Sequence, residues 1–140
     1  MAARLVSSGG TAVRQPASRN LHHPLIHRAT ETTDSKVEFT ALLDAESNWM
    51  LDGHRTHEGV ALLPGTGFLE LARAALAEVF PGRKLQLRDM VFMTPLVVQG
   101  PTEARLQFDR ANGDFVISSR PIVQEATGDW VEHARGSGEE

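Results

Sequence analysis

The sequence predicts an α+β fold in which one antiparallel sheet curves around a single helix. The first observation is the segment of residues 68–80, which contains no glycine or proline and carries apolar side chains over a broad arc. The second is the strand-rich stretch that follows it, with turn signals between its segments. A helix that is apolar over so wide an arc must be covered, and a curved sheet would cover it.

Composition and charge narrow the class of protein. The chain has 140 residues, enough for one domain, and its 41% hydrophobic and 23% charged residues are typical of a soluble globular protein. The formal net charge is −4 and no Lys/Arg run is interleaved with aromatic residues, which argues against a nucleic-acid partner. No apolar stretch reaches the roughly 18 residues needed to span a bilayer, so we expect no membrane segment.

The chain contains no cysteine, which excludes disulfides, thiolate metal sites and cysteine nucleophiles. A reducing compartment is compatible with this, and we expect a cytoplasmic protein. Four of the six histidines, His22, His23, His27 and His133, lack a coherent ligand spacing with carboxylates. We therefore expect them to have structural roles at strand edges and turns, and we expect no metal.

Residues 1–20 form a polar arm without sustained apolar periodicity. We interpret this arm as a flexible linker or chain end. Residues 1–30 contain four arginines and no acidic residue, a bias shared by organelle transit peptides, which is the weaker alternative. Order is expected to begin near residues 21–26.

Short patterns predict the elements before the helix. Residues 37–41 alternate apolar and polar side chains, which predicts a half-buried strand that continues through Leu42 and Leu43. Residues 44–47 indicate a turn, residues 49–51 are an apolar lead-in to His54, and residues 60–63 would cover the start of the helix.

The helix is predicted to follow the breaker cluster at residues 64–67 and to run for about three turns before Pro81-Gly82. Its polar face is predicted to group Glu70, Arg73, Ala74, Ala77 and Glu78. The apolar arc is predicted to contain Phe68, Leu69, Leu71, Ala72, Ala75, Leu76 and Val79.

Four strands are predicted after the helix, over residues 85–98, 104–108, 114–119 and 130–134. Pro95 lies near the end of the first. Turn signals separate the strands at residues 100–101, 112–113 and 128–129.

His54 is the first candidate for a functional residue, because it lies ten residues before Pro64, just upstream of the helix start. A neutral imidazole, with an ordinary pKa of about 6.5, can remove a proton from the carbon beside a carbonyl. Unpaired backbone N–H groups at a helix N-terminus can stabilise negative charge on an acyl oxygen. Judged alone, however, a histidine before a helix is more often a surface or capping residue.

Several spaced anchors run through the chain in a fixed order. They are His23-Pro24-Leu25, Leu51-Asp52-Gly53-His54, Gly59, the segment 64–72 (PGTGFLELA), Pro95-Leu96 and the segment 130–136 (WVEHARG). Together they resemble the N-terminal half of a polyketide synthase dehydratase domain, over about residues 22–136. The resemblance implies a hotdog fold, a long helix gripped by a curved antiparallel sheet, which agrees with the fold predicted above.

The resemblance also implies an activity and partners. The reaction would be that of a hydro-lyase, the dehydration of a β-hydroxyacyl thioester carried on the phosphopantetheine arm of an acyl carrier protein, with His54 as the base. No other cofactor is implied. Residues 21–136 would be the N-terminal hotdog, and residues 137–140 a tail leading to a second hotdog, within a dimer of the parent synthase. Backbone and side chains expected to line the substrate are those of Gly59, Leu63, Pro64, Gly65 and Thr66.

The chain departs from the family pattern in two respects. The family's signature is His, three residues, Gly, four residues, Pro, whereas four residues separate His54 from Gly59 here. The extra residue leaves open whether Glu58 takes the register of the glycine and whether His57 replaces His54 as base. In addition, the family takes an aspartate from the helix of the second hotdog, and no aspartate of this chain matches that motif.

Glu70 lies six residues after Pro64, where the single-hotdog dehydratases of bacterial fatty-acid synthesis carry an acid that serves the partner subunit. If this chain paired with itself, Glu70 could act as the acid opposite His54. The alternative, which we favour, is an ion pair with Arg73 on the polar helix face.

Two other functions remain open from the sequence. A hotdog without chemistry could dock carrier protein or partner domains, and the altered spacing after His54 supports that interpretation. A hotdog acyl thioesterase would hydrolyse the same thioester with a carboxylate that activates water.

Overall fold

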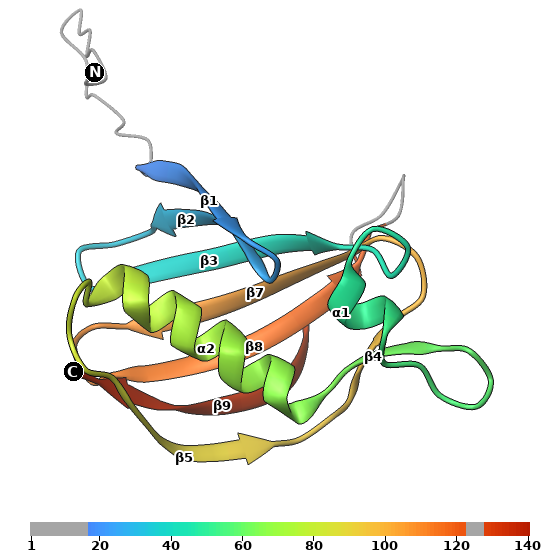
Figure 1. Ribbon diagram of the computed structural model, residues 1–140. Coiled ribbons are helices and arrows are strands. Elements are labelled where there is room, and N and C mark those ends of the chain that lie inside the picture. The colour runs from blue at the N-terminus through green and yellow to red at the C-terminus, as the bar shows by residue number, and fades with distance from the viewer. Residues whose placement is uncertain (1–16, 123–127) are drawn as a thin grey trace, which may run out of the picture.

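In the computed structural model, which describes residues 17–122 and 128–140, one long helix lies along one face of a curved sheet (Figure 1). The elements are β1 (Ser18–His23), β2 (Ile26–Glu31), β3 (Lys36–Leu43), α1 (Trp49–Asp52), β4 (Ala61–Leu63), α2 (Gly65–Val79), β5 (Gln86–Phe92), β6 (Leu96–Val98), β7 (Thr102–Asp109), β8 (Asp114–Pro121) and β9 (Val131–Glu139).

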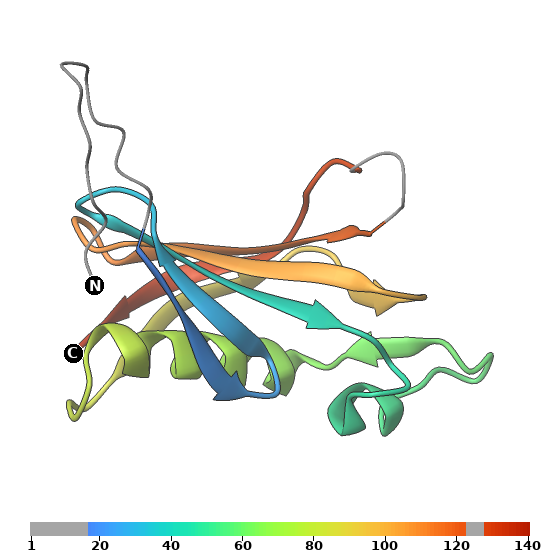
Figure 2. The same ribbon diagram turned by 90° about the horizontal axis from the view of Figure 1, so that it is seen from above.

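Seven of the strands form one antiparallel sheet in the order β1-β2-β3-β7-β8-β9-β5, and β4 pairs separately with β6. In the turned view of Figure 2, α2 is drawn below the twisted strands, along one face of the sheet. The predicted α+β arrangement, a curved antiparallel sheet around one long helix, is confirmed. The core lies between them, and its largest fully buried side chains include Phe39, Phe108, Phe115, Leu71 and Leu76.

α2 begins at Gly65, so residues 65–67 belong to the helix and not to the turn that the sequence predicted. Pro64 is the residue before the first helical turn, with φ of −71°, a value that its ring imposes. Gly67 is buried, and a Cβ there would lie 2.5 Å from Cδ1 of Leu63. This glycine allows β4 to pack closely against the helix start, a role that a pattern of helix breakers does not reveal.

Two positions of α2 differ from the predicted faces. Leu69 is 39% exposed although it was placed on the apolar arc, and Ala74 is 5% exposed although it was grouped with the polar residues. Ala74 lies on one helix stripe between Glu70 and Glu78, and both glutamates bond residues of β1. β1 therefore covers this side of the helix, whereas Leu69 lies outside the covered side.

The N-terminal hairpin of β1 and β2 was not predicted from the sequence. β1 begins at Ser18, so the last residues of the predicted polar arm are strand, while residues 1–16 lie outside the described residues. At the other end β9 runs to Glu139 and includes most of the predicted tail. Both segments are polar, and they become strands because a neighbouring strand pairs with them.

The remaining strand predictions are confirmed, except that one predicted strand is two strands in the structure. β3, β7, β8 and β9 match the predicted segments and extend beyond them. The segment 85–98 is two strands, β5 in the large sheet and β6 paired with β4. Pro95 lies between them, where a residue without an N–H interrupts the ladder. Among the described residues, no helix is long and apolar enough to cross a bilayer.

Candidate functional site

His54 lies on the segment that joins α1 to β4 (Figure 1). Its backbone carbonyl accepts the N–H of Leu62 at 2.9 Å, and Arg55 pairs with Ala61. His54 is therefore held opposite Leu62, two residues before Pro64 and the start of α2. The short helix α1 before it is capped by Asn48, whose Oδ1 accepts the N–H groups of Met50 and Leu51.

Among the described residues, the imidazole of His54 has one hydrogen-bond partner, the carbonyl oxygen of Met50, which lies 2.7 Å from Nδ1. A carbonyl oxygen only accepts, so we assign the proton to Nδ1 and a free lone pair to Nε2. The side chain is exposed. A histidine oriented in this way can take a proton through Nε2, which is the arrangement that a general base requires.

The start of α2 provides the backbone donors next to this segment. The N–H groups of Gly67 and Phe68 turn back onto the Pro64 carbonyl at 2.8 and 3.3 Å. Gly65 and Thr66 precede them at an exposed helix start, where no side chain of Pro64 caps the helix and no acidic residue lies in the first turn. N–H groups at this position have no acceptor within the helix and are available to an oxyanion.

A hydrogen-bonded turn at residues 56–60 lies in the segment where the chain has its extra residue. The N–H of Thr56 donates to Val60 at 2.8 Å, and the N–H of Gly59 donates back to Thr56 at 2.9 Å. Gly59 has φ of +82°, a left-handed conformation that favours glycine. His54 pairs with Leu62 on the near side of this turn, so the four residues between His54 and Gly59 lie outside that pairing.

This turn bears on three of the predicted site residues. His57 and Glu58 are exposed in the loop that projects beyond β4 (Figure 1), and Gly59, not Glu58, holds the left-handed position. The N–H of Gly59 is already used within the turn, so it is not available to a ligand, in contrast to the N–H groups at the helix start. Leu63, in β4, is buried and packs beneath that start.

Arg55 is a residue of this region that the sequence did not single out. Its Nη1 donates to the Gly59 carbonyl at 2.8 Å, and its Nε and Nη2 donate to Oδ1 of Asp52 at 3.2 and 2.8 Å. The guanidinium thus joins the end of α1 to the far side of the turn. Because Arg55 follows His54 directly, it fixes the segment that carries the imidazole.

Glu70 is not oriented as a proton donor. Arg73 donates to its two oxygens at 2.8 and 2.7 Å, and Nε2 of His23 lies 2.8 Å from Oε2. The hydrogen bonds from Arg73 lower the pKa of Glu70 most. Partial burial opposes this effect, His23 adds to it, and the resulting pKa is about 2. The carboxyl is ionised at neutral pH, which supports the ion pair with Arg73 and argues against Glu70 as a general acid.

Two of the other histidines make hydrogen bonds that stabilise the N-terminal hairpin. Nδ1 of His23 accepts the N–H of Leu25 at 3.0 Å, and Nδ1 of His27 accepts the N–H of Leu42 at 3.1 Å. His22 is exposed. Over residues 17–122 and 128–140, no group of three or more His, Asp or Glu side chains is arranged to hold a metal ion.

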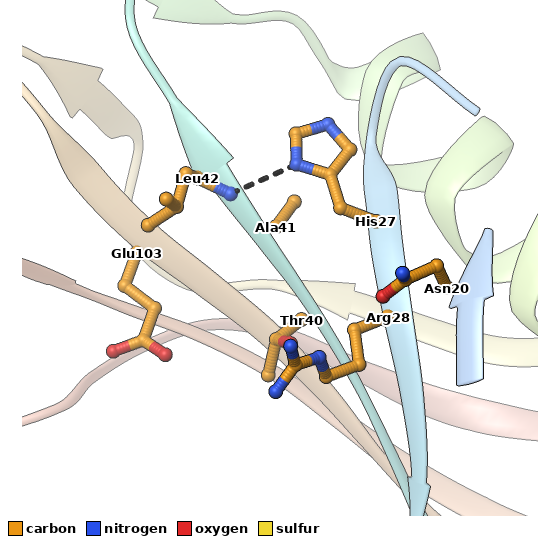
Figure 3. Close-up of a pocket in the computed structure, with 7 residues that line it drawn as sticks. All are labelled: Asn20, His27, Arg28, Thr40, Ala41, Leu42 and Glu103. Atoms are coloured by element: carbon orange, nitrogen blue, oxygen red, sulfur yellow. Dashed lines mark hydrogen bonds between the residues drawn. The ribbon is translucent and has the colours of Figure 1, made fainter. Parts of the chain in front are cut away.

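A cavity of about 350 Å³ lies on the face of the sheet away from α2 (Figure 3). Its lining residues are Asn20, His27, Arg28, Thr40, Ala41, Leu42 and Glu103. A second cavity, of about 380 Å³, lies at the C-terminal end of α2 beside Phe80. Neither of these two cavities contains a predicted site residue, and His54, Gly65 and Thr66 are exposed at the N-terminal end of α2.

Comparison with known proteins decides the family. The family model described as "Polyketide synthase dehydratase domain" matches residues 23–120. The chain belongs to this family. The matched range contains His54, Gly59, Pro64 and Glu70, while the anchor at residues 130–136 lies beyond it.

The curated relatives that match this chain include polyketide synthases. The "Spectinabilin polyketide synthase system protein NorA'" of Streptomyces orinoci is 33% identical over 126 residues, which is 81% of this chain and 3% of that protein. "Polyketide synthase PksN" of Bacillus subtilis (strain 168) is 32% identical over 99 residues, which is 66% of this chain and 2% of that protein. The chain thus spans a small fraction of the length of the curated relatives it matches.

Solved dehydratases share the fold. "GphF Dehydratase 1" has a TM-score of 0.70 at 25% identity, covering 84% of this chain and 44% of that one. The "Dehydratase domain from CurF module of Curacin polyketide synthase" has a TM-score of 0.69 at 24% identity, covering 84% of this chain and 43% of that one. The chain therefore has the hotdog fold of the polyketide synthase dehydratases, as the resemblance implied.

Proposed function

We propose that this chain supplies the base-bearing half of a β-hydroxyacyl thioester dehydratase, a hydro-lyase that acts within a polyketide synthase. The observation that carries the proposal is the orientation of His54, with Nδ1 on the Met50 carbonyl and Nε2 free beside the start of α2. Membership of the dehydratase family supports this reading of the geometry.

In the proposed reaction, Nε2 of His54 removes the α-proton of the thioester. The electron pair moves toward the carbonyl, and the N–H groups of Gly65 and Thr66 stabilise the oxyanion, where a lost donor costs roughly 3–4 kcal/mol of barrier. The electron pair then forms the α,β double bond, while the β-hydroxyl takes a proton from an acid and leaves as water. The product is an enoyl thioester. Pro64 has no N–H and shapes the approach to the donors.

We infer that the acid comes from a second hotdog. The solved dehydratases are more than twice as long as the segment that matches this chain, since the chain covers 44% of one and 43% of the other. β5 lies at one end of the sheet order and exposes Val91 and Phe92, each by 51%. The Phe92 ring lies 6.0 Å from that of Phe68 in the first turns of α2, so this apolar edge adjoins the site. A second hotdog on the edge would cover it and bring its acid close.

The substrate in this proposal is held on the phosphopantetheine arm of an acyl carrier protein, and no other cofactor takes part. The parent synthase would be a dimer, and the cytoplasmic location expected from the sequence stays a prediction. We favour the dehydratase over a docking module, because the hydrogen-bonded turn at residues 56–60 can accommodate the altered spacing after His54.

The test is turnover of a β-hydroxyacyl carrier protein by the full-length protein and by its His54→Ala variant, with products identified by mass spectrometry. Loss of a general base lowers the rate of enoyl formation by about 10²–10⁴-fold. His57→Ala is the matched control, since His57 is also exposed and lies three residues away, and it should retain activity. Loss of activity in the control with retention in His54→Ala would assign the base to His57. Free acid in place of enoyl thioester would identify a thioesterase.

A further inference from the structure

His133 is a buried histidine that the proposed reaction does not use. It is 4% exposed, and both ring nitrogens have partners: Nδ1 lies 3.0 Å from the Thr94 carbonyl and Nε2 lies 2.6 Å from Oγ of Ser119. We assign the proton to Nδ1, which donates to the carbonyl, and the Ser119 hydroxyl donates to Nε2. Burial lowers the pKa of His133, so the ring is neutral at pH 7.

His133 is the extra residue of a β-bulge in β9. Ile117 pairs with Ala134 and the next residue, Ser118, pairs with Glu132, which leaves His133 without a partner in β8. Its carbonyl accepts the N–H of Met93 instead, at 2.8 Å. Bulges reorient a side chain relative to the strand, and here both His133 and Ala134 are buried.

The bulge places this one side chain among three parts of the molecule. Ser119 belongs to β8 of the large sheet, and Thr94 lies on the link from β5 to β6. The imidazole also stacks on the ring of Phe68 in α2, with centroids 6.2 Å apart and planes 24° apart. Two residues beyond Thr94, Leu96 pairs with Leu63, the last residue before Pro64.

His133 therefore touches both elements on which the proposed site depends. Through Phe68 it contacts the first turns of α2, whose N–H groups are the proposed donors to the thioester. Through Thr94 it holds the link to β6, which pairs with β4, and β4 is the strand that fixes the His54 carbonyl through Leu62. The Ser119–His133 spacing resembles a nucleophile and base, but Ser119 is 7% exposed and neither residue lines a cavity described above, so contact with substrate is not indicated.

We propose that His133 is a positioning residue that fixes the start of α2 and the β4–β6 pair against the large sheet, through its hydrogen bond to Thr94. The inference rests on the proposed function for its effect on turnover, although the structural link can be measured without turnover. The bond to Ser119 satisfies the second ring nitrogen and orients the ring.

Two substitutions separate the two hydrogen bonds. In His133→Asn the amide nitrogen lies near the position of Nδ1 and keeps the donor to Thr94, while the bond to Ser119 is lost. In His133→Gln the amide oxygen lies near the position of Nε2 and keeps the acceptor for Ser119, while the bond to Thr94 is lost. Ser119→Ala is the matched third variant, because it removes the Ser119 bond and leaves the imidazole on Thr94.

We expect His133→Gln to lower kcat by roughly tenfold with little change in KM, since small misplacements at a site reduce turnover strongly. His133→Asn and Ser119→Ala should stay within about threefold of wild type, because both keep the Thr94 bond. The assay is carried out on full-length protein well below each variant's melting temperature. Equal losses in His133→Asn and His133→Gln, or losses that follow the melting temperature alone, would overturn the proposal.

Amide hydrogen exchange gives a second readout that needs no substrate. The Leu62 N–H, which donates to the His54 carbonyl, should exchange faster in His133→Gln than in His133→Asn. Unchanged Leu62 protection in His133→Gln would contradict the link even if turnover fell. If His54→Ala were fully active, the proposed function would fail, whereas the Leu62 result would still decide the role of His133.

Discussion

His54 and His133 each face a backbone carbonyl through Nδ1, at 2.7 and 3.0 Å, yet their surroundings give them different roles. His54 is exposed and its Nε2 is free, so the ring can exchange a proton with a ligand. His133 is buried and its Nε2 accepts from Ser119, so the ring joins elements of the fold. The difference shows that the partner of the second nitrogen, together with burial, separates a candidate base from a structural histidine.

The largest expected effect separates activity from stability at His54. His54→Ala should lower enoyl formation by about 10²–10⁴-fold while the melting temperature stays close to that of wild type, because the exposed ring has one hydrogen bond to lose. Thermal unfolding and product analysis on the same preparation check this. A large fall in melting temperature would place His54 with His133 as a structural residue.

The converse is expected at His133. His133→Ala leaves a cavity and removes the partners of Ser119 and the Thr94 carbonyl, so the free energy of unfolding should fall by about 2–4 kcal/mol. Urea unfolding followed by fluorescence measures it. A loss below about 0.5 kcal/mol, the usual range for surface substitutions, would mean that the two bonds are not made in solution.

The pH dependence of stability is the next comparison. The pKa of His133 is lowered by folding from its ordinary value of 6.5, so the unfolded chain binds more protons below that pH. Stability from this group is full above pH 6.5 and falls as the pH drops from 6.5 toward the folded pKa. The difference in unfolding free energy between wild type and His133→Asn should shrink over that window. A difference independent of pH would contradict a buried neutral imidazole.

The smallest effect is expected from Arg55, which fixes the segment next to His54. Its ion pair with Asp52 is on the surface, with side chains 35% and 63% exposed, so Arg55→Ala should cost about 0.2–1 kcal/mol of stability. Turnover should fall by less than in His54→Ala, because the backbone pairing of His54 with Leu62 remains. Urea unfolding and kcat check this, with Arg83→Ala as a control at a distant surface ion pair. Loss of turnover equal to that of His54→Ala would make Arg55 part of the site.

The sequence predicted the elements whose signals are local. The alternation in residues 37–43 and the apolar arc of residues 68–80 carry the periods of a strand and a helix, and the structure has β3 and α2 there. β1 was not predicted, because its residues are mostly polar and become a strand by pairing with β2. Ala74 was placed on the wrong face because β1, an unpredicted strand, covers it.

The candidate site divides in the same way. His54, Pro64 and the helix start are close together in sequence, so the family resemblance together with residue order pointed to the candidate base and the candidate oxyanion donors. The effect of the extra residue could not be read from spacing, because it depends on whether a turn or a strand takes up the insertion. The structure places it in the turn closed by Thr56 and Gly59.

The sequence by itself determined the α+β class, the helix after Pro64 and the absence of cysteine chemistry, because each rests on local periodicity or on residue type. The choice of His54 as the candidate base came from the spaced motifs of the family resemblance. Only the tertiary structure decided that Glu70 is held as an ion pair, that His54 keeps Nε2 free and that His133 is buried in a bulge. Those properties depend on partners far apart in the chain, such as His23 for Glu70 and Thr94 for His133. A side chain's protonation and hydrogen-bond partners are set by the groups that folding brings to it, and spacing along the chain does not specify them.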